Sequence, residues 1–102
     1  MSDIDLSTNR FLSDYRIKKF FIDSNDQRYE LSISNIIGSH GQQAFYTIFK
    51  PVEHDHIIYM SGFTTSWNSA KKIFKDIVLH MSEKYNVNVE DYPELQSFIS
   101  KI

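Results

Sequence analysis

The sequence predicts a single α+β domain spanning residues 1–102: an antiparallel, meander-like sheet of four strands, then a long amphipathic helix and a short C-terminal helix. Residues 15–63 fall into short apolar segments separated by turn residues, which is typical of antiparallel strands. Residues 67–85 carry apolar side chains at helical spacing. A chain of 102 residues that is 41% hydrophobic can bury one core but is too short for two.

The N-terminal part of the sheet is predicted to be a hairpin. Residues 1–13 are expected to be a polar lead-in, with a short helix after Asp5 or Ser7 as the alternative. The first strand covers residues 15–23; its apolar side chains fall on both parities, so a β-bulge is needed to bring them to one face. Ser, Asn and Asp at positions 24–26 favour a tight turn, because their side chains bond the local backbone.

The second strand is predicted at residues 28–35 from strict alternation of apolar and polar residues. Its apolar face is Tyr29, Leu31 and Ile33, and its polar face is Arg28, Glu30, Ser32 and Ser34. One polar face indicates a half-exposed strand. After a glycine-containing loop at residues 38–41, a third strand is expected at residues 43–50 and a fourth at residues 56–63. Both are apolar on two faces, which is typical of central strands or of strands whose second face is covered.

The long helix is predicted from a stripe that faces the core. Its members are Trp67, Ala70, Phe74, Ile77, Val78, Met81 and Tyr85. Thr65 or Ser66 is expected to cap its N-terminus, and Asn86 to adopt the left-handed conformation after its C-terminus.

The short C-terminal helix is expected to contain Pro93 in its first turn. Asp91 and Glu94 have the spacing of a capping box. The apolar face of this helix is formed by Leu95, Phe98, Ile99 and Ile102.

Composition narrows the class of protein. The net charge of −2 gives no overall attraction to nucleic acid or to an anionic membrane. The chain has no cysteine and no apolar run long enough to cross a membrane, and its acidic N-terminal residues are not expected to be a signal peptide; these features fit a cytoplasmic protein. Frequent Ile, Lys, Asn and Phe with scarce Ala, Gly and Arg indicate an AT-rich genome, such as that of a phage or a low-GC bacterium.

The Glu53-His54-Asp55-His56 segment is the clearest candidate for metal chemistry. Two histidines at i and i+2 of an extended segment share a face, and His40 or His80 would have to supply further ligands. The favoured interpretation is a solvated polar loop, so we expect no metal and no cofactor. No nucleophile motif and no phosphate-binding loop is present, and the protein is predicted not to be an enzyme.

Two surfaces are candidates for binding a partner protein. The first is the outer face of the long helix, formed by Lys71, Lys72, Lys75 and Leu79; the favoured alternative is a solvated face with Lys72 paired to Asp76. The second is the sheet face opposite the helices, with Tyr46 and Tyr59 as candidate contacts. This face either stays open as an interface, including one for a homodimer, or is covered by the N-terminal segment or the C-terminal helix.

The leading functional hypothesis is a small binding protein or inhibitor that occupies the surface of a partner protein. A phage- or mobile-element-encoded protein of anti-defence or immunity type would fit. The alternative is a nucleic-acid-binding regulator, because the order of elements over residues 15–85 resembles that of coactivators that bind single-stranded nucleic acid. The residues that come closest to such a groove are Tyr15, Arg16, Lys18, Lys19 and Phe20.

Overall fold

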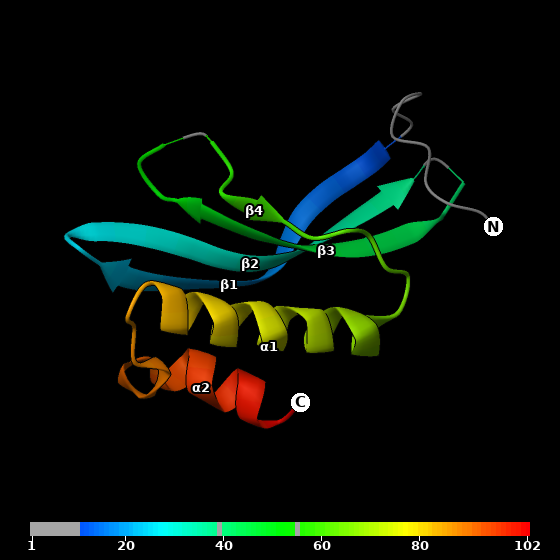
Figure 1. Cartoon of the computed structure of the whole chain (residues 1–102). Helices are drawn as coiled ribbons and strands as arrows, with labels where there is room; N and C mark the ends of the chain where they lie inside the picture. Colours follow the sequence, from blue (N-terminus) through cyan, green and yellow to red (C-terminus); the bar gives the residue numbers. More distant parts are fainter. Residues whose placement is uncertain (1–10, 39, 55) are drawn as a thin grey trace.

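The structure, a computed structural model, describes residues 11–38, 40–54 and 56–102. Its sheet has four antiparallel strands in chain order, so the predicted meander is confirmed (Figure 1). The strands are β1 (Phe11–Ser24), β2 (Gln27–Gly38), β3 (Gln43–Pro51) and β4 (Tyr59–Met60). β1 and β4 are therefore the two edges of the sheet.

The helices form a second layer on one side of this sheet (Figure 1). They are α1 (Trp67–Lys84) and α2 (Pro93–Ser100), joined through a 3-10 turn, η1 (Val89–Asp91). The core lies between the layers and contains Ile22, Tyr29, Leu31, Ile33, Phe49, Ala70, Phe74, Ile77, Val78, Met81, Leu95 and Ile99. The predicted α+β architecture is therefore the one observed.

Strand β1 is longer than predicted. It begins at Phe11, so residues 11–13 belong to the sheet rather than to a lead-in; residues 1–10, with the alternative helix, lie outside the described residues. The expected bulge is confirmed, because the register against β2 shifts between Arg16 and Lys18. After the shift, Ile22 faces the core and is 1% exposed, whereas the neighbouring Phe21 faces outward and is 40% exposed.

The turn between β1 and β2 consists of two residues with left-handed backbone. Asn25 has φ 53° and Asp26 has φ 63°, and the flanking Ser24 and Gln27 pair directly. Two positive φ angles in a two-residue hairpin loop define a type I′ turn, which matches the right-handed twist of the strands. Asn is well suited to the first position, but Gly is the preferred residue at the second.

Replacing Asp26 with Gly should therefore stabilise the protein. Glycine adopts positive φ without the steric cost that a β-carbon brings, so we expect a gain of about 0.5–1 kcal/mol, read from the urea midpoint. Asp26→Ala is the matched control and should lower the urea midpoint. Alanine keeps the β-carbon, which is unfavourable at positive φ, and loses the carboxylate that lets Asp bond the local backbone in this conformation. A midpoint that falls for Asp26→Gly would contradict this account of the turn.

The polar face of β2 differs from the prediction. Glu30, Ser32 and Ser34 are buried, with exposures of 8%, 0% and 0%. The reason lies in the ladder, where Ser32 stands between Lys19 and Ile48. Longer side chains on both neighbouring strands flank the small serine, so a polar face on a central strand is covered rather than half-exposed.

Strand β4 is the largest departure from the prediction. It pairs only at Tyr59 and Met60, with an isolated bridge at Thr64, rather than over residues 56–63. The Ser61 hydroxyl accepts the hydrogen bond from the Thr47 N–H at 2.8 Å, where a regular ladder would use a backbone carbonyl. The segment is consequently an irregular edge, and its two-faced apolar pattern does not mark a buried central strand.

Helix α1 follows the prediction closely. Ala70, Phe74, Ile77, Val78 and Met81 are buried, and Trp67 and Tyr85 pack partly buried against them. Ser66 is the N-cap and accepts a hydrogen bond from the Ser69 N–H at 3.1 Å. At the other end Asn86 has φ 57°, and the N–H groups of residues 86 and 87 donate to the carbonyls of residues 83 and 82, which is a Schellman motif.

The predicted capping box of α2 does not form. Asp91 belongs to η1, which is capped by the Asn88 side chain, and the N-cap of α2 is Tyr92 without a side-chain cap. Pro93 occupies the first turn as expected. The Tyr92 hydroxyl instead bonds the backbone of Asp23, at the edge of the sheet.

Candidate interaction surfaces

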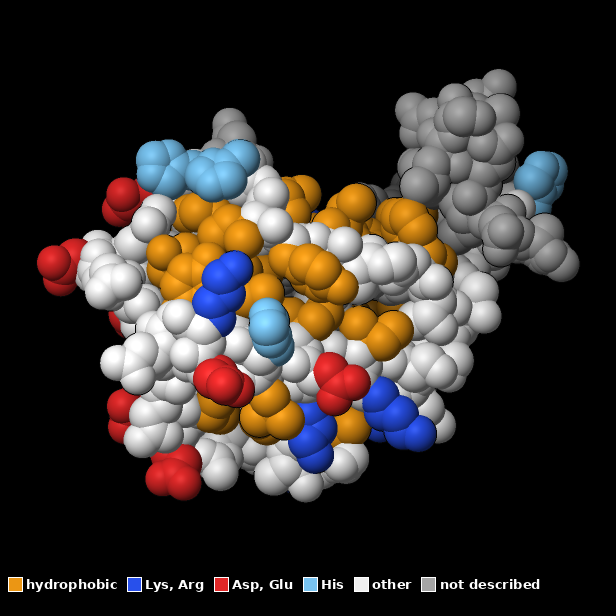
Figure 2. Space-filling model, in the orientation of Figure 1, with side chains coloured by type: hydrophobic (Ala, Val, Ile, Leu, Met, Phe, Trp, Pro, Cys, Tyr) orange, Lys and Arg blue, Asp and Glu red, His pale blue; other side chains and the backbone are white. Residues whose placement is uncertain are grey.

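An apolar exposed surface lies along β4 and the residues that flank it. Four side chains between positions 57 and 63 are exposed and are here called the apolar edge: Ile57 (45%), Tyr59 (41%), Met60 (49%) and Phe63 (40%). Figure 2 shows hydrophobic side chains gathered over this part of the molecule, between β4 and α1. Contiguous exposed apolar surface of this kind usually marks an interaction site.

A groove of about 370 Å³ separates the apolar edge from α1. Its wall on the sheet side is Ile58 and Tyr59, and its floor includes the buried Met81. Its α1 wall carries Asp76, His80 and Lys84, which are one helical turn apart from one another and so share a side of the helix. The groove therefore offers an apolar floor with polar groups along one rim.

The predicted lysine surface lies on the adjacent, outer side of α1. Leu79 is 48% exposed and Lys72 is exposed, whereas Lys71 and Lys75 are half-buried. The Lys75 Nζ donates to a backbone oxygen of Ile102 at 3.5 Å, so this lysine also holds the end of α2 against α1. Among the described residues no ion pair joins Lys72 to Asp76.

The predicted aromatic pair is split by the fold. Tyr46 is 7% exposed and lies on the sheet face away from the helices, in a small buried cluster with Ile36 and Ile48. Its ring contacts that of Phe63 edge to face at 5.1 Å between centroids. Tyr46 thus offers little surface to a partner, whereas Tyr59 belongs to the apolar edge. The C-terminal helix does not cover this second face, because Leu95 and Ile99 of α2 belong to the core between the sheet and α1.

The same sheet face holds a partly buried ion pair between Arg16 and Glu30. The Arg16 Nε donates to a carboxylate oxygen of Glu30 at 2.8 Å, and the Ser32 hydroxyl donates to the same oxygen at 2.8 Å. Burial raises the pKa of the Glu30 carboxyl, but the hydrogen bonds from Arg16 and Ser32 and the charges of Arg16 and Lys19 outweigh it. The pKa therefore lies below its ordinary value. Arg16 is thereby committed to an intramolecular partner.

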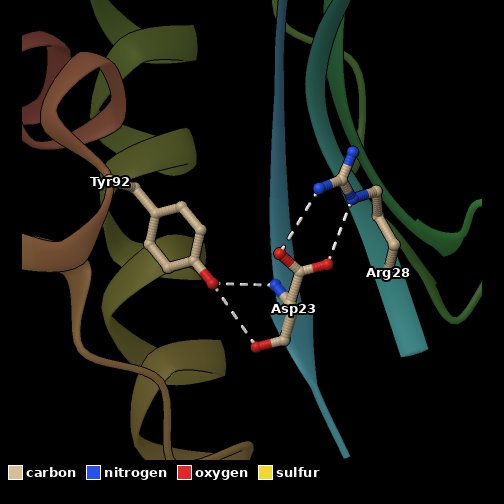
Figure 3. A network of polar contacts seen from close by, with 3 residues as sticks. All are labelled: Asp23, Arg28 and Tyr92. Atoms are coloured by element: carbon tan, nitrogen blue, oxygen red, sulfur yellow. Dashed lines mark hydrogen bonds and ion pairs between the residues drawn. The ribbon is translucent and has the colours of Figure 1, made fainter. Parts of the chain in front are cut away.

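The β1 edge is closed at one point by the helical layer. The Tyr92 hydroxyl accepts a hydrogen bond from the Asp23 N–H at 2.9 Å and donates to the Asp23 carbonyl at 3.5 Å. Figure 3 shows the tyrosine approaching the strand from the helix side, while the Asp23 carboxylate points away to Arg28 at 3.1 Å. One side chain thus satisfies both outward backbone groups of an edge residue.

Two adjoining hollows of about 570 and 600 Å³ run beside this edge, between β1 and residues 91–101. Both are lined by Lys19, Phe20, Pro93 and Glu94. The Lys18 Nζ lies over the Phe98 ring, 5.5 Å from its centroid. The basic residues of the predicted nucleic-acid groove are therefore partly engaged by the protein itself, Arg16 by Glu30 and Lys18 by Phe98.

The histidine segment does not assemble a metal site in the part of the chain that the structure describes. The rings of His54 and His56 lie 5.6 Å apart between centroids, and Asp55 is outside the described residues. No group of three His, Asp or Glu side chains that could hold a metal is found within residues 11–38, 40–54 and 56–102.

Sequence reasoning missed three members of the apolar edge, Ile57, Met60 and Phe63. The signal was present, because two helices can cover only one face of a four-stranded sheet and residues 56–63 are apolar on both faces. The missing information was the pairing: this segment is the last strand of the meander, and it pairs with β3 in a short ladder in which the Ser61 hydroxyl replaces a backbone carbonyl.

Comparison with known proteins adds no relative, since no protein-family model, no curated protein and no solved structure matches the chain. Within the described residues, none of the helices has the length and apolar character required to cross a membrane.

Proposed function

We propose that the protein is a small, non-enzymatic binding module or inhibitor that acts by occupying the surface of a partner protein through its apolar edge. The observation that supports this proposal is the exposure of Ile57, Tyr59 and Met60 along the edge of the sheet, where Tyr59 also lines a groove against α1. Exposed apolar side chains in one continuous stretch gain free energy when a partner removes them from water.

The partner is expected to present an apolar patch with acidic side chains around it. Lys84 lines the groove, and Lys72 is exposed on the neighbouring side of the helix. Lysines at the rim of an interface attract and orient a negatively charged partner more than they add affinity. A cytoplasmic setting, an anti-defence or immunity role and a phage origin remain predictions from the sequence.

The test uses affinity capture with the double variant Ile57→Asp/Met60→Asp. Both side chains are exposed, so the variant should fold normally while losing at least about tenfold in partner affinity, because two charges cannot be buried without compensation. Tyr15→Asp is the matched control: Tyr15 is 49% exposed, like Met60, but lies on the opposite edge strand. Its capture of the partner should equal that of the wild type.

A photo-crosslinking residue at position 60 should label the same partner, and one at position 15 should not. Capture that is equally strong with the double variant would contradict the proposal. Capture of nucleic acid with steep salt dependence would favour the alternative, a nucleic-acid-binding regulator.

A further inference from the structure

A second binding site, independent of the apolar edge, is indicated by the backbone of the opposite edge strand. The two-residue turn makes Ser24 and Gln27 a hydrogen-bonded pair. Antiparallel ladders alternate, so the backbone groups of every second residue from Asp23 point away from β2. The hydrogen bond from the Asp23 N–H to Tyr92 is direct evidence for this alternation.

The next two outward positions along β1 are Phe21 and Lys19. Within the described residues, their outward N–H and C=O groups have no hydrogen-bond partner in the protein. They lie beside the two hollows between β1 and α2. A sheet edge with free donors and acceptors next to a groove is the arrangement to which an extended peptide adds as a further strand.

The open stretch has two clear ends. At one end Tyr92 occupies the backbone of Asp23, and at the other the register shift between Arg16 and Lys18 interrupts the regular edge. About five residues, 18–22, remain available. A second copy of β1 is a poor occupant, because that strand has 14 residues and the open stretch has about five.

The charge along the groove changes from one end to the other. The hollow beside Tyr92 is lined by Asp23, Asp91 and Glu94 against Lys19 and Arg28, so the preference for an acidic residue is confined to the opposite end. At the end near Ile17, the lining includes three lysines, Lys18, Lys19 and Lys101, against one carboxylate, Glu94. Phe20 and Phe98 supply an apolar wall for side chains on the helix side, with their ring centroids 5.5 Å apart. An extended segment with an acidic residue at this end and an apolar residue beside it complements both features.

We propose that the β1 edge between the register shift and Tyr92 binds a short, extended, acidic peptide segment by strand addition at Lys19 and Phe21. Main-chain hydrogen bonds contribute affinity for any extended peptide, and the lysines favour peptides with an acidic residue at that end of the groove. This site does not depend on the apolar edge, and a partner could engage either surface alone.

The experiment selects phage-displayed random heptapeptides on the full chain and measures synthetic copies of the enriched sequences by fluorescence anisotropy. Phe21→Pro removes the outward N–H while leaving the ladder to β2 intact, because proline is tolerated where the N–H of an edge strand faces solvent. Phe21→Ala is the matched control, since it removes the same side chain and keeps the N–H. We expect acidic, β-branched peptides whose affinity falls at least tenfold with Phe21→Pro and less than threefold with Phe21→Ala.

Two further measurements keep the test decisive if the proline variant folds poorly. In the wild-type protein the amides of Lys19 and Phe21 should show the largest chemical-shift changes on peptide binding, and Lys19→Glu should weaken acidic peptides at least tenfold. The Ile57→Asp/Met60→Asp variant should bind the peptides like the wild type. Absence of enriched peptides, selection of non-acidic ones, shifts confined to β4 and α1, or a dimer abolished by Phe21→Pro would each overturn the proposal.

Discussion

Truncating Phe74 to Ala should destabilise the protein by about 3–5 kcal/mol, the largest loss we expect from a single substitution. Phe74 is fully buried, and its ring contacts Phe20 of β1 at 5.8 Å and Phe98 of α2 at 5.6 Å between centroids. Phe20 and Phe98 also contact each other. Removing Phe74 therefore leaves a cavity where the edge strand and both helices meet, and the surrounding groups cannot close it fully.

Urea and thermal unfolding measure this effect. A domain of this size is stable by about 5–15 kcal/mol, and the melting temperature should fall on the order of 20 °C. Leu79→Ala is the matched control, because Leu79 lies on the same helix but is 48% exposed; its cost should stay below about 1 kcal/mol. Phe74→Leu should lie between the two. Equal losses at positions 74 and 79 would contradict the assignment of the core.

Replacing Arg16 with Met should cost about 2 kcal/mol at neutral pH. The substitution leaves the Glu30 carboxylate buried with only Ser32 and Lys19 to stabilise its charge. Breaking a fully buried ion pair costs roughly 3–5 kcal/mol, and a smaller loss is expected here because the Arg16 side chain is 31% exposed. The double variant Arg16→Met/Glu30→Gln should recover part of the loss, since it no longer buries an unpaired charge.

The loss should depend on pH with a defined sign. The pKa of Glu30 is lowered in the folded protein, so its contribution is present above the unfolded-state pKa and disappears as the pH falls through the folded-state pKa. Urea unfolding at neutral pH and at about pH 3 should therefore show a smaller difference between wild type and Arg16→Met under acid conditions.

A matched pair on the surface provides the control for this experiment. The Arg28–Asp23 ion pair has a similar length of 3.1 Å, but its side chains are 58% and 53% exposed. Arg28→Met should leave the urea midpoint nearly unchanged, because water and salt screen exposed pairs. If Arg16→Met and Arg28→Met behaved alike, burial would not be the reason for the strength of the Arg16–Glu30 pair.

Much of the fold could be predicted because local patterns determine it. The stripe from Trp67 to Tyr85, the Ser66 cap and the left-handed Asn86 each follow from the chemistry of a few neighbouring residues. The bulge in β1 could be anticipated because the apolar parity of the strand changes. These features do not require knowledge of what lies across the sheet.

The features that could not be predicted depend on contacts between distant segments. Alternation along β2 correctly identified its two faces, but the burial of Glu30 depends on Arg16 from the neighbouring strand. The apolar pattern of residues 56–63 could not reveal that Ser61 takes over a backbone position in the ladder. For the same reason the Tyr92 contact with Asp23, 69 residues away, has no signature in the sequence.

The meander also has a consequence for how the chain folds. Each strand pairs with its neighbour in sequence, so the first three strands can assemble by closing short loops, which costs little chain entropy and is fast. The bond between Tyr92, at the start of α2, and Asp23 spans 69 residues, and closing a longer loop costs more chain entropy. We therefore expect α2 to be the last element to settle during folding and the first to detach during unfolding. Its detachment would leave the outward backbone of β1 uncovered at Asp23, so the transient loss of one short helix would also lengthen the sheet edge open to other chains.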